Sequence, residues 1–442
     1  MSKGLPALAN IKNYFRLPFF TIRFAQQLNL SIGFFFENFV RLMLSVCDTV
    51  AIDLSAQLSR VVSNLCQAQR SFALWRMPEN KYLYLVASFS SSPKHYDQAD
   101  LEILPAGFLV APFDVRKGVY FIPADEQYKW EMFPEKNTGQ LVSANSIQLF
   151  EQQSSLLTPL QIDHFKGYLS PTTISVHTPE SFQLIVSEAI RAIERHEFQK
   201  VVLSRQKCIL LEKEFHPIDF FLRLTYRYPS AFVSLVAIPE VGVWIGASPE
   251  LLVSVDKHQI FRTMALAGTK ARNGLTNLQQ ATWTQKEIGE QAMVSRYIIN
   301  CFKKIRLREF EEYGPRTVAA GELIHLRTDF EVDMRATNFP QLGTVMLSLL
   351  HPTSAVCGMP KEPAAAFIYQ YEHYDRSLYS GYLGCVNIEN ESHLFVNLRC
   401  LQLQHNHVIL YAGAGITEDS DPEKEWQETE MKCDTLLKVL RS

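Results

Sequence analysis

The sequence of 442 residues lacks several patterns that mark particular classes of protein. Its eight cysteines are scattered singly, so they form neither the paired spacing of a zinc site nor a disulfide framework, and they fit the reduced thiols of a cytoplasmic protein. The formal net charge of −3 provides no basic surface for nucleic acid. These absences favour a cytoplasmic globular protein that binds no nucleic acid.

Acidic residues are missing from the N-terminal region, where none precedes Glu37. This basic bias over residues 1–40 fits an organellar transit peptide, a basic surface extension or translation from an upstream start codon, and we favour a cytoplasmic protein with a basic extension. The apolar stretch at 30–46 is interrupted by Glu37 and Arg41, well short of the roughly 18 uncharged residues that a spanning helix needs. We therefore expect no membrane segment.

Residues 41–172 carry no chemical motif and alternate short apolar runs with turn residues. Hydrophobic residues make up 47% and charged residues 20% of the chain, which is the balance of a globular protein. The pattern predicts strands in this half at 81–89, 107–113 and 118–124, with a loop at 90–98.

From residue 173 onward the periodicities are clearer. Thr178 before Pro179 predicts a helix start, and helical spacing continues until just before Lys200. Further segments predict strands at 231–239, 243–255 and 260–269, a helix at 277–304, a hairpin of 393–404 with 407–415, and a last helix at 422–440. Runs of strands with helices interposed predict a large layered α/β domain rather than a doubly wound nucleotide-binding fold.

Lys200 stands at the start of the apolar run "KVVL", which is typical of a strand covered on both faces. Withdrawal from water penalises the ammonium relative to the amine, so a lysine at such a place can act as a base. The alternative is a strand-end lysine that extends its ammonium to solvent. The stretch alone favours this second interpretation.

Glu250 follows Ser248 and Pro249 at the end of a predicted strand, and proline there stops the strand ladder. A carboxyl in a partly apolar cleft has a raised pKa and can donate a proton near neutrality, so Lys200 and Glu250 together would form a base and an acid. In isolation, a surface glutamate after a turn is the simpler interpretation of Glu250.

Two pairs of glutamates are spaced three residues apart on predicted helices, Glu287 with Glu290 and Glu425 with Glu428. This spacing places both members of a pair on one helix face, and four carboxylates from two facing helices would suit Mg²⁺. Each pair alone is more typical of a solvated helix face, and Lys432 would then be an ordinary salt-bridge partner of Glu428. The segments "LAGTKA" (266–271) and "YAGAGIT" (411–417) predict small-residue loops after strands, without the spacing of a nucleotide-binding loop.

Nine segments in succession resemble the chorismate-utilising family, which includes isochorismate synthase, salicylate synthase and the large subunits of anthranilate and aminodeoxychorismate synthases. They are "KVVLSR", "GASPELL", "LAGTKA", "KEIGEQ", "HLRT", "HPTSAVCGMP", "LYSGYLG", "VNLRCL" and "AGAGITEDSDPEKEWQETEMK". The resemblance covers residues 175–442. It implies one large two-lobed α/β (α+β) domain with its active site between the lobes, so that residues 41–172 would belong to the same domain as 173–442.

The resemblance also implies roles for individual residues. Lys200 would be the base that activates water for attack at C2 of chorismate, and Glu250 the acid that protonates the departing C4 hydroxyl. Glu290 and Glu428 would hold Mg²⁺, with Glu287 and Glu425 supporting it through water. The expected substrate-binding residues are Gly268, Thr269, His325, Ala355, Tyr379, Arg399, Gly413, Gly415 and Lys432, of which Tyr379 and Arg399 would grip the enolpyruvyl carboxylate.

Two positions narrow the branch of the family. At the first position, relatives that add ammonia carry another residue in place of Lys200, so Lys200 implies the branch that adds water. At the second position, Ala355, isochorismate synthases resemble this chain in having alanine, whereas salicylate synthases carry threonine. The resemblance therefore implies an isochorismate synthase that uses Mg²⁺ and acts on chorismate, with salicylate synthase or a catalytically silent chorismate-binding subunit as alternatives. The sequence leaves the oligomeric state open, and we expect a monomer. Gln291, in place of the usual histidine, and Cys357, in place of a common glycine, depart from the family pattern.

Overall fold

The structure is a computed structural model of the chain, and it describes residues 54–133, 138–144, 160–169, 174–175, 177–211, 215–272, 277–320 and 323–441. The chain divides into two units, residues 1–53 and residues 54–442, of which only the second is described. The predicted extension at 1–40 and the domain start at residue 41 lie outside the described residues and stay predictions.

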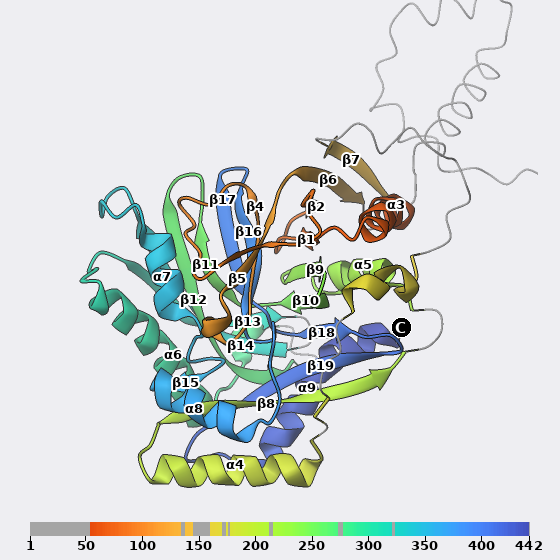
Figure 1. Cartoon of the computed structure of the whole chain (residues 1–442). Coiled ribbons are helices and arrows are strands. Elements are labelled where there is room, and N and C mark those ends of the chain that lie inside the picture. The colour runs from red at the N-terminus through yellow and green to blue at the C-terminus, as the bar shows by residue number, and fades with distance from the viewer. Residues whose placement is uncertain are drawn as a thin grey trace, which may run out of the picture. The chain divides into compact units, whose positions relative to one another are not determined.

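Two antiparallel sheets organise the second unit, and their strands run in clearly different directions in Figure 1. In spatial order, the ten-stranded sheet contains β15 (Gly358–Met359), β8 (Lys200–Leu210), β19 (His407–Ile416), β18 (Cys400–Leu403), β10 (Gly242–Ser248), β9 (Phe232–Ile238), β1 (Phe72–Arg76), β2 (Tyr82–Ala87), β6 (Glu126–Phe133) and β7 (Thr138–Ala144). The nine-stranded sheet contains β13 (Glu311–Ala320), β14 (Leu323–Asp333), β12 (Ile260–Ala271), β11 (Leu251–Val255), β17 (Glu391–Val396), β16 (Tyr382–Ile388), β4 (Gly107–Ala111), β5 (Val119–Pro123) and β3 (Lys94–Tyr96).

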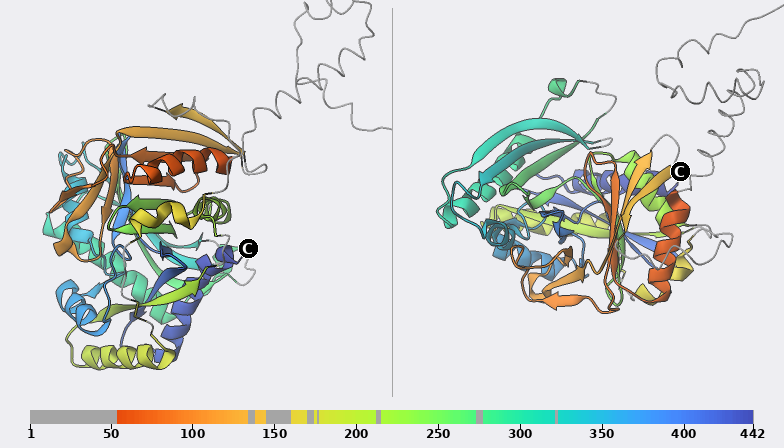
Figure 2. Two further views of the ribbon diagram at one scale, coloured as in Figure 1. Left: turned by 45° about the vertical axis from the view of Figure 1, so that its right-hand side comes forward. Right: turned by 90° about the horizontal axis from the view of Figure 1, so that it is seen from above.

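The helices cover the outer faces of these sheets. The α-helices of the described residues are α3 (Leu54–Gln67), α4 (Pro179–Glu194), α5 (Pro217–Arg227), α6 (Gln285–Lys304), α7 (Leu342–Leu350), α8 (Lys361–Tyr371) and α9 (Pro422–Leu440). Short 3₁₀ turns are η1 (Val115–Lys117), η3 (Ile162–Tyr168) and η4 (Leu278–Gln280). Figures 1 and 2 show α3 and α4 near opposite ends of the ten-stranded sheet, where α3 contacts β7 and α4 contacts β8.

The core has layers because successive side chains of a strand point to opposite faces. In β1, Phe72 and Leu74 face the cluster formed with α3, α5 and α9, while Ala73 and Trp75 face the nine-stranded sheet. Helices α6 and α7 pack on the far side of the nine-stranded sheet, and α4 and α8 pack against β8. Strands buried on both faces explain the uninterrupted apolar runs in the sequence.

Local signals predicted several elements well. Helix α4 begins as expected, with the Thr178 hydroxyl accepting a hydrogen bond from the Ser181 amide at 3.3 Å, and α9 has the predicted bounds. The predicted helix at 277–304 begins late, because residues 278–280 form η4 and the capping box of Thr284 starts α6 at Gln285. The loop at 90–98 contains the short strand β3, which pairs with β5.

Two predicted loops and two predicted strands were wrong. The segments 266–271 and 411–416 continue β12 and β19 instead of forming loops, and their glycines allow close approach of other groups within the sheets. The predicted strand 243–255 is two strands, because β10 and β11 belong to different sheets. The predicted strand 393–404 is also two strands, because β17 belongs to one sheet and β18 to the other. The predicted hairpin therefore consists of β18 and β19 alone.

No helix within the described ranges is long and apolar enough to cross a membrane.

Candidate active site

One open cavity gathers thirteen of the fifteen residues that the sequence analysis assigned to a site. It has about 740 Å³ of empty space, solvent at its mouth included. The predicted residues that line it are Lys200, Glu250, Gly268, Thr269, Glu290, His325, Ala355, Tyr379, Arg399, Gly413, Gly415, Glu428 and Lys432. The two that do not line it are Glu287 and Glu425.

The cavity lies where the chain passes between the two sheets. Glu250 stands in the connection from β10 to β11, and Arg399 stands in the connection from β17 to β18. Backbone hydrogen bonds hold the two crossings together, since the Val396 amide donates to the Glu250 carbonyl at 3.0 Å and the Ala247 amide donates to the Arg399 carbonyl at 3.0 Å. A carboxyl and a guanidinium thus leave the sheets side by side.

The Glu250 side chain has the electrostatics of an acid. The residue is 4% exposed, and its burial raises the pKa to about 7 although the cations of Lys200, Arg399 and Lys432 act in the opposite direction. Burial penalises the carboxylate more than the neutral acid, which explains the direction. A pKa near 7 allows Glu250 to hold a proton and to release it near neutrality.

Lys200 begins β8 and is 3% exposed, so the interpretation as a strand-end lysine reaching solvent is wrong. Gly415 on the neighbouring strand makes room for it, because a Cβ at position 415 would lie 3.0 Å from the Lys200 Cε atom and 3.4 Å from its Nζ atom. Lys200 makes no ion pair with any carboxylate in the described ranges. Its ammonium or amine is therefore available to a bound molecule.

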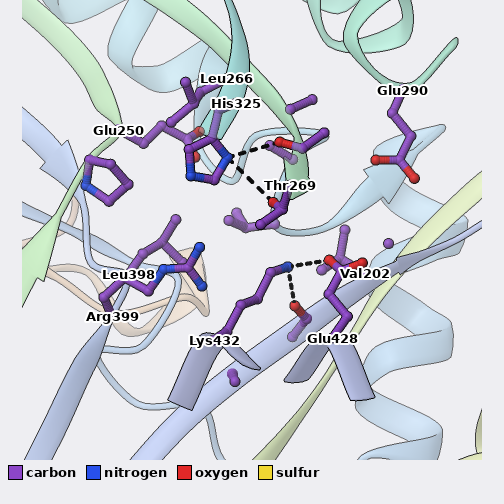
Figure 3. A pocket seen from close by; sticks show the side chains of 18 of the residues that line it. Val202, Glu250, Leu266, Thr269, Glu290, His325, Leu398, Arg399, Glu428 and Lys432 are labelled. Atoms are coloured by element: carbon purple, nitrogen blue, oxygen red, sulfur yellow. Dashed lines mark hydrogen bonds and ion pairs between the residues drawn. The ribbon is translucent and has the colours of Figure 1, made fainter. Parts of the chain in front are cut away.

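His325 on β14 is held in one tautomer. Its Nδ1–H donates to the Gly268 carbonyl at 2.8 Å, and burial and the Arg399 charge lower its pKa to about 3. The ring is therefore neutral, and its buried Nε2 atom has no hydrogen-bond partner among the described residues. Gly268 has a φ of +66°, which suits glycine, and Figure 3 shows Thr269 beside the same ring.

Arg399 and Tyr379 both line the cavity. Burial lowers the Arg399 pKa, and the guanidinium has no ion-pair partner within the described part of the chain. Tyr379 is 3% exposed and stacks on Tyr411 with ring centroids 5.3 Å apart. Gly413 leaves room for this tyrosine, since a Cβ there would lie 3.0 Å from the Tyr379 hydroxyl. A planar carboxylate matches such a guanidinium.

Glu290 and Glu428 approach the cavity from different helices, α6 and α9 (Figure 3). Glu428 pairs with Lys432 at 2.7 Å, and Lys432 also donates to the Gly413 carbonyl at 2.6 Å. Burial alone would raise the pKa of Glu428, but Lys432 and other cations outweigh it and the pKa is lowered. Glu290 has no ion-pair or hydrogen-bond partner in the described ranges.

The other two glutamates also form ion pairs with lysines. Glu287 closes the capping box of α6 and pairs with Lys270 at 3.0 Å. Glu425 is 1% exposed and pairs with Lys286 at 2.6 Å, and its burial raises its pKa. Their predicted role in supporting a metal through water stays a prediction.

The residues present fit magnesium better than a metal held by protein groups alone. Within the described residues, no group of three or more His, Cys, Asp or Glu side chains is arranged to hold a metal ion. Mg²⁺ commonly uses only one or two carboxylates and completes its shell with water and substrate oxygens. The unpaired Glu290 and the nearby Glu428, both facing the cavity, are donors of that kind.

Comparison with known proteins identifies the family. Residues 131–441 match the family described as chorismate binding enzyme, which is more than half of the chain. The chain belongs to this family. Its fold agrees, because the chorismate-binding enzyme superimposes on MenF, the menaquinone-specific isochorismate synthase from Escherichia coli, with a TM-score of 0.65 and 21% identity over 86% of this chain and 91% of that one.

Two further relatives extend this likeness. The isochorismate synthase EntC of Escherichia coli K12 is 28% identical over 312 residues, covering 70% of this chain and 79% of EntC. Anthranilate synthase component I from Streptococcus pneumoniae has a TM-score of 0.59 at 20% identity, covering 83% of this chain and 89% of that one. The chorismate-utilising α/β fold predicted from the resemblance is therefore confirmed, and the chorismate-binding enzyme shares it with both kinds of synthase.

The sequence analysis missed several residues that line the cavity of this chorismate-binding enzyme. Tyr411 is the most prominent, because it stacks on Tyr379 and donates to Gln402 at 3.0 Å. Alternation along a strand would have identified it, since Tyr411, Gly413 and Gly415 all line the cavity at a spacing of two. The other missed lining residues are Val202, Pro249, Leu266, Ala267, Val356, Leu398 and Ala412.

The two departures from the family pattern lie outside the cavity lining. Gln291 is 2% exposed, and its amide nitrogen donates to the Ala265 carbonyl at 3.2 Å and to the Thr328 hydroxyl at 2.9 Å. It thereby ties α6 to β12 and β14. Cys357 is fully buried, with its Sγ atom 3.7 Å from the Lys361 carbonyl. Both residues contribute to packing behind the site.

Proposed function

We propose that this chorismate-binding enzyme is an isochorismate synthase, which adds water at C2 of chorismate and removes the C4 hydroxyl. The observation that carries the proposal is the presence of a candidate base and a candidate acid in one cavity. Lys200 is buried without an ion-pair partner among the described residues, and the pKa of Glu250 is raised to about 7. The relatives named isochorismate synthase give further support.

The proposed reaction is a displacement with two proton transfers, one from the entering water and one to the leaving hydroxyl. Lys200 as the amine accepts a proton from water while the oxygen bonds to C2, the ring π electrons shift, and the C4–O bond breaks. Glu250 gives its proton to the departing oxygen, so one water enters and one leaves. Lys200 is then charged and Glu250 ionised, and proton exchange with solvent restores both. The chemistry needs no redox cofactor.

Substrate orientation would come from the opposite wall. Arg399 and Tyr379 would hold the enolpyruvyl carboxylate, and Gly413 and Gly415 leave the space in which the Tyr379 hydroxyl and Lys200 reach the ligand. Fixing the ring in this way converts the attack of water into an effectively unimolecular step. The other predicted substrate-binding residues of the cavity would complete its walls.

Glu290 and Glu428 are the residues that we propose hold Mg²⁺. When bound, the ion would neutralise the ring carboxylate of chorismate. Glu290, free of a lysine partner in the described ranges, would make the principal contact, while Lys432 keeps Glu428 ionised. The lysine-paired Glu287 and Glu425 would act behind these two carboxylates.

The residue at position 355 supports the isochorismate branch over salicylate synthase. Ala355 lines the cavity and offers only a methyl group, so it gives no hydroxyl that could assist loss of pyruvate. We propose that isochorismate leaves as the product and serves menaquinone or siderophore biosynthesis, and that the enzyme is a cytoplasmic monomer.

The test is turnover of chorismate in ¹⁸O-labelled water with Mg²⁺, with a parallel reaction in EDTA. The expected product is isochorismate labelled at C2, with little pyruvate and little reaction in EDTA. Unlabelled isochorismate would contradict the water mechanism. Stoichiometric pyruvate with salicylate would establish salicylate synthase instead, and binding of chorismate without turnover would establish a silent subunit. An Ala355→Thr variant is expected to form more pyruvate than the native chain.

A further inference from the structure

The strand that carries Lys200 lies next to the edge of its sheet. One side of β8 pairs with β19 along its length, but on the other side the two-residue strand β15 pairs only with Lys200 and Val201. Beyond this point, the Val202 amide donates to the Cys357 carbonyl at 2.7 Å, and the next outward backbone groups of β8 have no strand partner among the described residues. Such groups need other partners when they are buried.

Two side chains supply those partners. The Ser204 amide donates to the Glu372 Oε1 atom at 2.6 Å, and Arg376 Nη2 donates to the Val202 carbonyl at 2.7 Å. The Arg376 Nε atom donates in turn to Glu372 Oε2 at 2.7 Å. Donor and acceptor thus alternate along the edge of β8 as they would on a neighbouring strand.

The same arginine also contacts a second segment that lines the cavity. Arg376 Nη1 donates to the Val356 carbonyl at 2.8 Å, and Val202 and Val356 both line the cavity. Lys200 lies two residues before Val202, and Ala355 lies directly before Val356. The Arg376 guanidinium therefore connects the strand that carries Lys200 with the segment that carries Ala355, in addition to the backbone hydrogen bond from the Val202 amide to the Cys357 carbonyl.

The pair is poorly explained by stability alone. The side chains of Glu372 and Arg376 are each 2% exposed. The desolvation of two charges offsets much of their mutual attraction, and apolar replacements of buried pairs are often neutral or stabilising. A rigid, planar group with several donors is, however, suited to fixing two backbone segments at one separation.

We propose that Glu372 and Arg376 are positioning residues for the reaction, which set the location of Lys200 relative to the 355–357 segment. This inference rests on the proposed function, because its catalytic consequence is measured with chorismate. Glu372 and Arg376 do not line the cavity, so they act through the backbone of Val202, Ser204 and Val356.

Arg376→Ala is the decisive variant. A misplacement of the base by about 1 Å can lower turnover about 10²-fold, so we expect kcat to fall by that order. KM should change little, since Arg399, Glu290 and Glu428 belong to other segments. A surface cavity with about 600 Å³ of empty space, open solvent included, is lined in part by Arg376 and Glu372 and lies beside the deleted side chain. Low millimolar guanidinium should therefore enter and restore kcat in a saturable way, whereas ammonium should not.

Arg70→Ala is the matched control. Arg70 also joins a mostly buried carboxylate, Glu126 at 3.0 Å, to a backbone carbonyl, that of Ser88 at 2.6 Å, but it lies away from the cavity lining. Its loss should lower the unfolding midpoint without changing kcat per folded molecule. An equal effect of both variants on kcat would overturn the proposal.

A second readout is independent of turnover. Hydrogen exchange at the Ser204 amide should accelerate in Arg376→Ala and in the milder Arg376→Lys, and the latter serves if the alanine variant does not fold. Unchanged exchange at Ser204, unchanged kcat in a folded variant, or a loss of kcat that guanidinium does not restore would each overturn the positioning role. A native chain that does not convert chorismate would refute the proposed function. The hydrogen-exchange experiment would still test the contact of Glu372 and Arg376 with the backbone of β8.

Discussion

Replacing the acid with its neutral isostere, Glu250→Gln, should separate stability from activity in this enzyme. Glu250 is 4% exposed, and the glutamine has nearly the same size, so the change removes a titration without opening a cavity. We expect the variant to lose about 10²- to 10⁴-fold in turnover, the usual loss for a proton donor. We also expect it to become more stable than the native chain at alkaline pH.

The size of this stability difference follows from the pKa of the buried Glu250 carboxyl. Its pKa is raised from the usual 4.5 to about 7 by burial. At about 1.36 kcal/mol for each unit of pKa, the folded state holds this proton more tightly than the unfolded state by about 3 kcal/mol. Because the folded pKa is the higher one, this contribution is complete below pH 4.5 and is lost as the pH rises through about 7. Glutamine does not titrate, so the Glu250→Gln variant does not lose stability in this way.

The assay is urea unfolding of both proteins at a series of pH values from about 4 to about 8.5. The free energy of unfolding of Glu250→Gln minus that of the native chain should increase with pH by about 3 kcal/mol, most of it before pH 8. Other titrating groups largely cancel in this difference. Glu423→Gln, on the exposed first turn of α9, is the control for replacing a glutamate outside the cavity.

Two results would refute this reasoning. A flat difference for Glu250→Gln would mean that the carboxyl is not held neutral by burial. A variant that becomes less stable than the native chain as the pH rises would mean that the cations of the cavity dominate and that Glu250 is ionised. Native turnover should also fall as the pH rises above about 7, because the acid form of Glu250 is lost.

Three further changes test other parts of the cavity. Lys200→Ala should lower turnover about 10²- to 10⁴-fold in a folded protein, and near-normal turnover would remove Lys200 as the base. Glu290→Gln and Glu428→Gln should each raise the Mg²⁺ concentration needed for half-maximal activity, and titration calorimetry with Mg²⁺ should show the same weakening. Gly415→Ala should displace Lys200 and lower turnover, because the added Cβ would lie 3.0 Å from the Lys200 side chain. The unfolding midpoint should change little, since that side chain is flexible. Gly289→Ala is the control, because a Cβ at position 289 meets no atom within 4 Å.

The start of α4 could be predicted from residues next to one another in the sequence, whereas the position of Arg399 could not. Thr178 and Pro179 carry their signal within one helical turn. The break at residues 397–399 divides the predicted strand 393–404 between two sheets, because β17 pairs with β11 and β16 while β18 pairs with β10 and β19. The partners β11 and β10 are distant in sequence and leave no local mark. Only the whole series of motifs identified Arg399.

The glutamate pairs show a similar limit. Spacing of three residues correctly placed Glu425 and Glu428 on one helix, but it could not show what faces them. Lys286 reaches Glu425 from another helix, and Lys270 reaches Glu287 from β12. The sequence thus predicts which carboxylates are close to the site, while the lysines that pair with Glu287 and Glu425 come from other elements and depend on tertiary packing.

The position of Glu428 and Lys432 on α9, the last helix, has a consequence during biosynthesis. Lys200 is translated 232 residues before Lys432. At about 5–20 residues per second, that interval is roughly 10 to 50 seconds. For most of this interval β8 lacks its neighbour β19, and throughout it the cavity lacks the complete helix α9. A nascent chain therefore exposes an incomplete sheet edge to the cell, and a ribosome that stalls late produces an inactive and aggregation-prone polypeptide instead of a weakened enzyme.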